Sequence, residues 1–189
     1  YALHANTAGG RVRFVTDSPY IAINAVMGAL GKMCHFPLTG SVGFDMYADG
    51  IYVKTFAPPF DIKGGYESIF EFDKKEMREI TINFPLYSDV LDVYVGIQKN
   101  ASLREASPYA NEKPVVFYGS SITHGFYSLM QNNTYVYQLG RKLGYDPYNL
   151  GFAGSCALEK EVADYISENG TERNERTWDF ALLELGINT

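Results

Sequence analysis

The spacing of apolar residues changes near residue 108, and this change constrains the fold more than any other feature of the sequence. Before it, apolar and polar side chains alternate in short runs, as in strands that bury one face. After it, continuous apolar runs such as 115–118 occur, as in parallel strands buried on both faces. The run 99–113 is polar and contains proline, which is typical of a linker. We therefore expect a first domain at 1–108, a linker at 109–113 and a second domain at 114–189.

The first domain is expected to be an antiparallel β-sandwich. The alternation predicts roughly seven strands, at 11–14, 21–26, 44–48, 51–55, 67–72, 79–84 and 91–97. Asp49-Gly50 separates two of them and predicts a tight hairpin, because a type I′ turn needs positive φ at both central residues. The polar stretch Asp73–Arg78 is compatible with one helical turn.

Strands alternate with helices in the second domain. The expected strands are 115–118, 148–152 and 180–185. One helix has an apolar face and ends at Gly144, and a second begins with Ser155 as its N-cap. Their apolar faces consist of Val136, Leu139 and Leu143 in the first helix and Leu158, Val162, Tyr165 and Ile166 in the second. This order predicts a parallel sheet with right-handed crossovers. Since three strands and two helices would leave one face bare, we expect the chain to be part of a longer protein.

Charge and composition argue against several classes of function. The net charge is −6 and no cluster of Lys or Arg exceeds two residues, so we expect no nucleic-acid partner. No run approaches the ~18 apolar residues of a membrane span, so we expect a soluble protein without a membrane partner, either cytoplasmic or secreted. Cys34 and Cys156 make no disulfide framework. His4, His35 and His124 lack metal-ligand spacing. Oligomeric state is not readable from the sequence.

Three short segments that could carry chemistry each follow one of the expected parallel strands. They are Gly119–Thr123, Asn149–Ser155 and Gly186–Asn188. Each alone also fits an ordinary turn, but the carboxyl ends of parallel strands meet at one edge of the sheet, where ligands bind. A serine hydroxyl, a glycine N–H and an asparagine amide that converge there provide a nucleophile and oxyanion donors. The combination therefore favours acyl transfer.

These three segments resemble blocks I, II and III of SGNH (GDSL-like) hydrolases, in the same order. Residues 1 to about 108, including Phe36–Asp45, resemble the jelly-roll-like sandwich that precedes the hydrolase domain in one branch of that family. The resemblance implies a partial three-layer α/β/α (flavodoxin-like) domain and a serine esterase without metal or organic cofactor. It makes Ser121 the nucleophile, with its own N–H, Gly154 and Asn188 as the oxyanion hole.

The sequence departs from the family pattern at two places. Block I usually has Asp before the nucleophile, whereas Ser120 stands there. The family's Asp-x-x-His block, which supplies the base, is absent and is expected beyond Thr189. Without a base, a serine hydroxyl is a poor nucleophile at neutral pH.

Other polar residues have weaker assignments. We expect Ser120 and His124 to contact substrate, with His124 at the mouth of the site rather than acting as the base. His35 is expected to be structural, His4 solvated, and Glu184 a satisfied core acid.

The expected substrate is a small or carbohydrate-linked O-acyl ester. The alternative is a non-catalytic carbohydrate-binding sandwich attached to an inert α/β part, with Phe56, Phe60 and Tyr66 as candidate stacking residues. Packing within the sandwich is the other interpretation of these three aromatic side chains.

Overall fold

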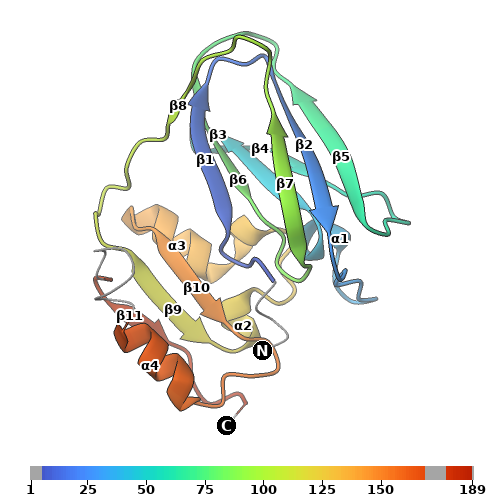
Figure 1. Ribbon diagram of the computed structural model, residues 1–189. Coiled ribbons are helices and arrows are strands. Elements are labelled where there is room, and N and C mark those ends of the chain that lie inside the picture. The colour runs from blue at the N-terminus through green and yellow to red at the C-terminus, as the bar shows by residue number, and fades with distance from the viewer. Residues whose placement is uncertain (1–5, 169–177, 189) are drawn as a thin grey trace. The chain divides into compact units, whose positions relative to one another are not determined.

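The computed structural model describes residues 6–168 and 178–188, and the chain forms two compact units, each described here by itself (Figure 1). The first unit comprises Tyr1–Ser107 and Tyr127–Asn132, and the second comprises Pro108–Phe126 and Asn133–Thr189. The sequence division placed 127–132 in the second domain, whereas in the structure this segment groups with the first unit.

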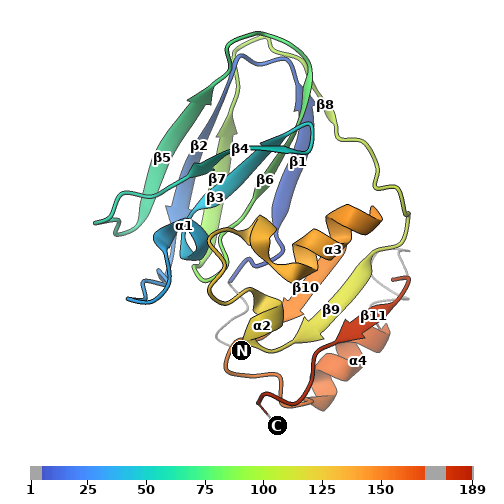
Figure 2. The same cartoon turned by 180° about the vertical axis from the view of Figure 1, so that it is seen from behind.

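Two antiparallel sheets build the first unit (Figures 1 and 2). The five-stranded sheet has the order β4-β3-β6-β1-β8, with β1 Arg11–Thr16, β3 Phe44–Ala48, β4 Ile51–Phe56, β6 Arg78–Asn83 and β8 Leu103–Glu105. The three-stranded sheet has the order β5-β2-β7, with β2 Tyr20–Met27, β5 Gly65–Glu71 and β7 Val90–Gly96.

The two sheets share one apolar core, so the unit is sandwich-like. Alternate residues of β2 are buried, and so are residues of β3 and β6 from the other sheet. The most buried of these side chains are Ile21, Ile23, Phe44, Met46, Ile80 and Ile82. The period of two in the sequence therefore marks the buried faces of both sheets.

The hairpin predicted at Asp49-Gly50 is confirmed. Both residues have positive φ, 51° for Asp49 and 77° for Gly50, and β3 pairs antiparallel with β4 across them. A Cβ at position 50 would meet nothing within 4 Å, so glycine serves backbone conformation there rather than packing.

Three local features of this unit differ from the sequence predictions. The stretch Asp73–Arg78 contains bends and no helical turn. Leu103–Glu105, in the run interpreted as a linker, forms β8 and pairs with β1. A four-residue helix, α1 (Leu38–Ser41), follows Pro37. Short elements of this kind depend on their neighbours in space, and a polar pattern does not reveal them.

The second unit contains the predicted parallel sheet, in the order β10-β9-β11. Its strands are β9 Val115–Gly119, β10 Pro147–Gly151 and β11 Ala181–Leu183. Both outer strands pair in parallel with β9. Its helices are α2 Ser121–His124, α3 Tyr135–Leu143 and α4 Lys160–Glu168. The short helix η2, Gln131–Asn133, begins in the first unit and ends in the second.

One helix covers each face of this sheet, so the expectation of a bare face was wrong. Val115 and Phe117 pack against Val136 of α3. Tyr118, whose side chain points to the other face, packs against Val162 of α4. Because β9 is central, the two right-handed crossovers run in opposite directions and place their helices on opposite faces.

The two long helices meet their predictions differently. α3 ends at Gly144, which has φ 74° as predicted for a glycine cap. α4 begins at Lys160 rather than beside Ser155, and Leu158 is 56% exposed instead of lying on the apolar face. Cys156 and Leu158 both have positive φ, so the chain turns before the helix can start.

Among the described residues, no helix combines the length and the apolar character that crossing a membrane requires.

Candidate active site

The first candidate segment is a sharp turn from β9 into α2. Ser120 is the N-cap of α2, and its Oγ accepts a hydrogen bond from Ile122 N at 3.3 Å. Gly119 allows the turn to close, because a Cβ there would lie 2.1 Å from Thr123 Oγ1. The turn therefore delivers Ser121 as the first residue of the helix.

Ser121 is half-buried and its polar groups are available. The first N–H groups of a helix have no partner inside the helix. In the part of the chain that the structure describes, neither the hydroxyl nor the N–H of Ser121 makes a hydrogen bond to protein. A hydroxyl and an N–H on one residue can thus face the same bound carbonyl group.

Glu184 holds this turn in place. One carboxylate oxygen, Oε2, accepts hydrogen bonds from Ser120 N at 2.8 Å, Ser120 Oγ at 2.6 Å and Thr123 Oγ1 at 3.3 Å. Thr123 Oγ1 also lies 2.8 Å from the hydroxyl of Tyr135. Burial and the nearby Glu184 charge raise the pKa of Tyr135, against the effect of the Thr123 bond. The contacts support the interpretation of Glu184 as a satisfied structural acid.

The second candidate segment lies directly against the first. Phe152 N donates to Gly119 O at 2.8 Å, and Ala153 N donates to His124 Nδ1 at 3.4 Å. A Cβ at Gly151 would lie 2.0 Å from His124 N. Only glycine permits this approach of the two segments.

Gly154 is the exposed corner of the second segment. Its φ is 71° and a Cβ would meet nothing within 4 Å, so the backbone stands next to open space. Its N–H has no hydrogen-bond partner among the described residues. This donor is available to a ligand.

The third segment, Gly186–Asn188, contacts the second segment. The side-chain amide of Asn188 donates to Ser155 O, beside Gly154. Cys156 Sγ lies 3.8 Å from Glu184 O and donates to it. Burial raises the pKa of the Cys156 thiol, which keeps its proton for this bond. An asparagine amide has two N–H groups, so one remains after the bond to Ser155.

Hydrogen bonds therefore link the second segment to the first and to the third. Glu184, which lies two residues before the third segment, bonds to the first. Ser121, Gly154 and Asn188 each follow one strand of the parallel sheet, on the side where the carboxyl ends of the strands lie. Sequence reasoning did not find that Glu184, directly after β11, bonds to the first segment. A carboxylate between Leu183 and Leu185 was the available signal, since an acid in an apolar strand needs a partner.

The residues expected to contact substrate lie deeper than predicted. Ser120 is 1% exposed and bonded to Glu184, and His124 is 2% exposed rather than at the mouth. His35 lies in the first unit with its ring 5.4 Å from that of Tyr127. His4 lies outside the described residues.

Two of the three aromatic side chains considered for glycan stacking belong to the sandwich core. Phe56 and Tyr66 are 0% and 8% exposed, and Tyr66 donates to Phe56 O at 2.6 Å. Phe60 is 90% exposed.

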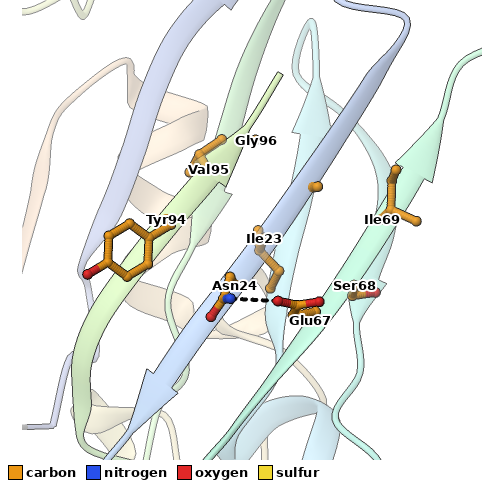
Figure 3. Close-up of a pocket in the computed structure, with 9 residues that line it drawn as sticks. Ile23, Asn24, Glu67, Ser68, Ile69, Tyr94, Val95 and Gly96 are labelled. Carbon is orange, nitrogen blue, oxygen red and sulfur yellow. Dashed lines mark hydrogen bonds between the residues drawn. The ribbon is translucent and has the colours of Figure 1, made fainter. Parts of the chain in front are cut away.

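A separate depression of about 520 Å³ lies on the outer face of the three-stranded sheet (Figure 3). Its lining includes Ala22 and Gly96, which face one another across β2 and β7, with Tyr94 and Ile69 on the flanks. Asn24 Nδ2 donates to Glu67 Oε1 at 2.7 Å within it. The depression thus combines an exposed aromatic ring with a polar pair.

Two sequence families match the chain. Residues 1–103 match the family described as GxDLY, the N-terminus of SGNH hydrolase-type esterases. Residues 112–172 match the GDSL-like lipase/acylhydrolase family. The G-x-D-L-Y pattern reads Gly43-Phe44-Asp45-Met46-Tyr47 in this chain. A search of curated proteins found no match.

Several solved structures have a similar fold. A GDSL-like lipase from Bacteroides ovatus has a TM-score of 0.86 and 26% identity, over 98% of this chain and 53% of that one. A salicylyl-acyltransferase from a tetracycline biosynthetic pathway has a TM-score of 0.75 and 22% identity, over 97% and 50%. An acetyl xylan esterase from Butyrivibrio proteoclasticus has a TM-score of 0.67 and 13% identity, over 97% and 57%. The chain spans about half the length of these structures.

Proposed function

This chain belongs to the SGNH hydrolase-type esterases, and from that premise we propose that it carries the nucleophile and oxyanion hole of a serine ester hydrolase. The observation that carries the proposal is the position of Ser121. It begins a helix with its hydroxyl and N–H available, and two further donor groups, the Gly154 N–H and the Asn188 amide, lie in the segments that follow the two neighbouring strands.

In the proposed reaction, Ser121 Oγ attacks the ester carbonyl carbon. The carbonyl oxygen becomes an oxyanion, which the N–H groups of Ser121 and Gly154 and the Asn188 amide stabilise. The alcohol leaves and an acyl-serine remains, which water hydrolyses to the acid and free Ser121.

The hydroxyl requires a proton acceptor. His124 is not available for this task in the described arrangement, because its Nδ1 accepts the Ala153 N–H and its ring is buried. We assign the acceptor to the family's Asp-x-x-His block, outside the described residues. That histidine would take the proton from Ser121 and return it to the leaving alcohol.

We further propose a small O-acyl ester, in particular one linked to carbohydrate, as the substrate. The support is analogy, since an acetyl xylan esterase shares the fold. The finer fold terms are proposals as well: a jelly roll for the first unit and a three-layer α/β/α sheet for the second. The order β10-β9-β11 supports the latter, because it matches the start of a flavodoxin-like sheet.

Turnover of p-nitrophenyl acetate by the protein that contains this chain tests the esterase function. We expect Ser121→Ala to lower kcat/KM by at least about 10³-fold. Ser167→Ala is the matched control, because Ser167 is exposed on α4 and its Oγ donates to Asp164 O, three residues earlier in the same helix. Mass spectrometry after treatment with a fluorophosphonate should find the adduct on Ser121. Equal activity of the two variants would reject Ser121 as the nucleophile.

A second candidate function is glycan binding by the first unit, which the depression in Figure 3 favours. Tyr94 is 62% exposed and offers a ring for stacking, and Asn24 and Glu67 offer hydrogen bonds to hydroxyl groups. Calorimetric titration with xylo- and cello-oligosaccharides tests it. Tyr94→Ala should weaken binding at least tenfold, whereas Tyr52→Ala, on the other sheet, should not. Absence of heat from every sugar would remove this function.

A further inference from the structure

Asp45 is a carboxylate buried inside the first unit. It lies on β3 and is 1% exposed. Asn83 Nδ2 donates to its Oδ2 at 2.9 Å. Burial raises the pKa of Asp45, and hydrogen bonding to Asn83 and to the backbone of Gln131 and Asn132 acts in the opposite direction. A buried carboxylate is unfavourable unless such donors surround it. Gln131 and Asn132 lie 86 and 87 positions further along the chain than Asp45.

That segment, 127–132, is fitted to the surface of the first unit. Gly40 of α1 lies so close that a Cβ there would come within 2.0 Å of Ser128 O. The Tyr127 ring lies 5.4 Å from His35 and 6.4 Å from Phe36. The start of the segment thus lies against Gly40, His35 and Phe36 of the first unit.

Burial of Gln131 and Asn132 carries a free-energy cost. Gln131 is 2% exposed, and in the described part of the chain neither end of its side-chain amide has a hydrogen-bond partner. Asn132 is 6% exposed and its Oδ1 is likewise without a partner there. Polar atoms left in this way oppose docking. Hydrogen bonds to a charged carboxylate are stronger than neutral ones and offset this cost.

We propose that Asp45 is a positioning residue that holds segment 127–132 on the first unit. The segment continues directly from α2 and Gly125-Phe126, so the clamp restrains the chain immediately after the helix that carries Ser121. Asp45 is the acidic residue of the Gly43–Tyr47 pattern, and its role in this proposal is to hold segment 127–132.

Amide hydrogen exchange, measured residue by residue by NMR, tests the clamp. Asp45→Ala removes both acceptors, and we expect the Gln131 and Asn132 amides to exchange at least tenfold faster, relative to the amides of β6. Asp45→Asn keeps one acceptor oxygen and should produce a smaller increase. Asp61→Ala, an exposed aspartate of the same unit, is the control and should leave exchange in 127–132 unchanged.

Gly40→Ala provides an independent test that leaves the carboxylate intact. Its new Cβ would collide with the Ser128 carbonyl, so this variant should release the same amides. It also covers the case in which Asp45→Ala does not fold. Equal protection of 127–132 in wild type and in both Gly40→Ala and Asp45→Asn would overturn the clamp. An increase shared equally by β3, β6 and the segment would mean a general loss of stability and would also overturn it.

Hydrolysis of p-nitrophenyl acetate is the second measurement. Unlike hydrogen exchange, it rests on the proposed esterase function. We expect Asp45→Ala to reduce kcat for p-nitrophenyl acetate about tenfold, with Asp61→Ala unchanged. Release of the segment with full turnover would overturn the positioning role. If wild type has no turnover, the esterase proposal fails, while hydrogen exchange still decides whether Asp45 holds the segment.

Discussion

Ser120 occupies the position at which block I of the resembled family usually has aspartate, and Glu184 gives the physical reason why serine fits. The Ser120 hydroxyl donates to Glu184 Oε2 at 2.6 Å, and the same oxygen accepts two further bonds. An aspartate at 120 would place a second carboxylate against the first. Two carboxylates at this distance cannot both be ionised without a large cost.

We therefore expect Ser120→Asp to destabilise the second unit by about 2–4 kcal/mol. Glu184→Gln in the same chain should recover at least half of that loss, because its neutral amide can pair with the new carboxylate. Urea denaturation followed by the fluorescence of Trp178, the single tryptophan, measures both. A double variant no more stable than Ser120→Asp would contradict the pairing.

The buried carboxyl of Asp45 should make stability depend on pH. Burial raises the pKa of Asp45 from 3.8 to about 6, against the effect of its hydrogen bonds from Asn83, Gln131 and Asn132. The folded state thus holds the proton more tightly than the unfolded state. The favourable contribution is complete below about pH 4 and is lost as pH rises through about 6, a change of up to about 3 kcal/mol.

Asp45→Asn cannot titrate and should lack this dependence. The unfolding free energy of wild type minus that of Asp45→Asn is expected to fall by about 3 kcal/mol from pH 4 to pH 7. Urea denaturation at unit pH steps, monitored by circular dichroism, gives this difference and cancels the other titrating groups. Parallel pH curves for the two proteins would show that Asp45 has an ordinary pKa.

At the scale of elements, the site depends on how closely the turn after β9 approaches the end of β10. Gly151 lies where a Cβ would come 2.0 Å from His124 N, whereas Gly154, three residues later, has open space around it. The two glycines of one segment thus serve different purposes: close packing at 151 and backbone conformation with an exposed N–H at 154.

Alanine substitutions should separate these purposes. Gly151→Ala is expected to destabilise the second unit by about 3 kcal/mol through overpacking. Gly154→Ala should cost only about 1 kcal/mol, from its positive φ. Urea denaturation with Trp178 fluorescence compares them, and equal losses would contradict the assignment.

Other elements show which local sequence signals are enough to predict a turn, a cap or a strand. The Asp49-Gly50 turn and the Gly144 cap of α3 occur where the sequence predicts them, because residue type and backbone angle are directly linked there. β8 and the start of α4 differ from prediction. β8 exists because β1 offers an edge to pair with. α4 starts late because Glu159 bonds to Tyr118 OH and Ala157 N in the preceding turn.

At the scale of the molecule, the two units have separate apolar cores. Phe44 belongs to the core of the first unit and Phe117 to that of the second. Trp178 lies in the second unit, where its Nε1 donates to Ile166 O at 3.0 Å. Chains with separate cores do not have to unfold in one step.

We expect each core to control its own transition. Phe44→Ala should shift the circular dichroism transition of the first unit by about 3–5 kcal/mol and leave the Trp178 fluorescence midpoint unchanged. Phe117→Ala should lower the fluorescence midpoint. Coincident shifts of both signals in both variants would show that the units unfold as one.

The sequence by itself determined that an alternating β region precedes an α/β region, and it placed most of the strands. It also determined the order of the three segments that contain Ser121, Gly154 and Asn188. These follow from periodicity and residue type, which act locally along the chain. Only the tertiary structure decided that Glu184 holds the first segment, that His124 is buried, and that 127–132 joins the first unit beside Asp45. Each of these depends on groups brought together from distant positions, and no local pattern specifies which distant donor will meet a buried carboxylate.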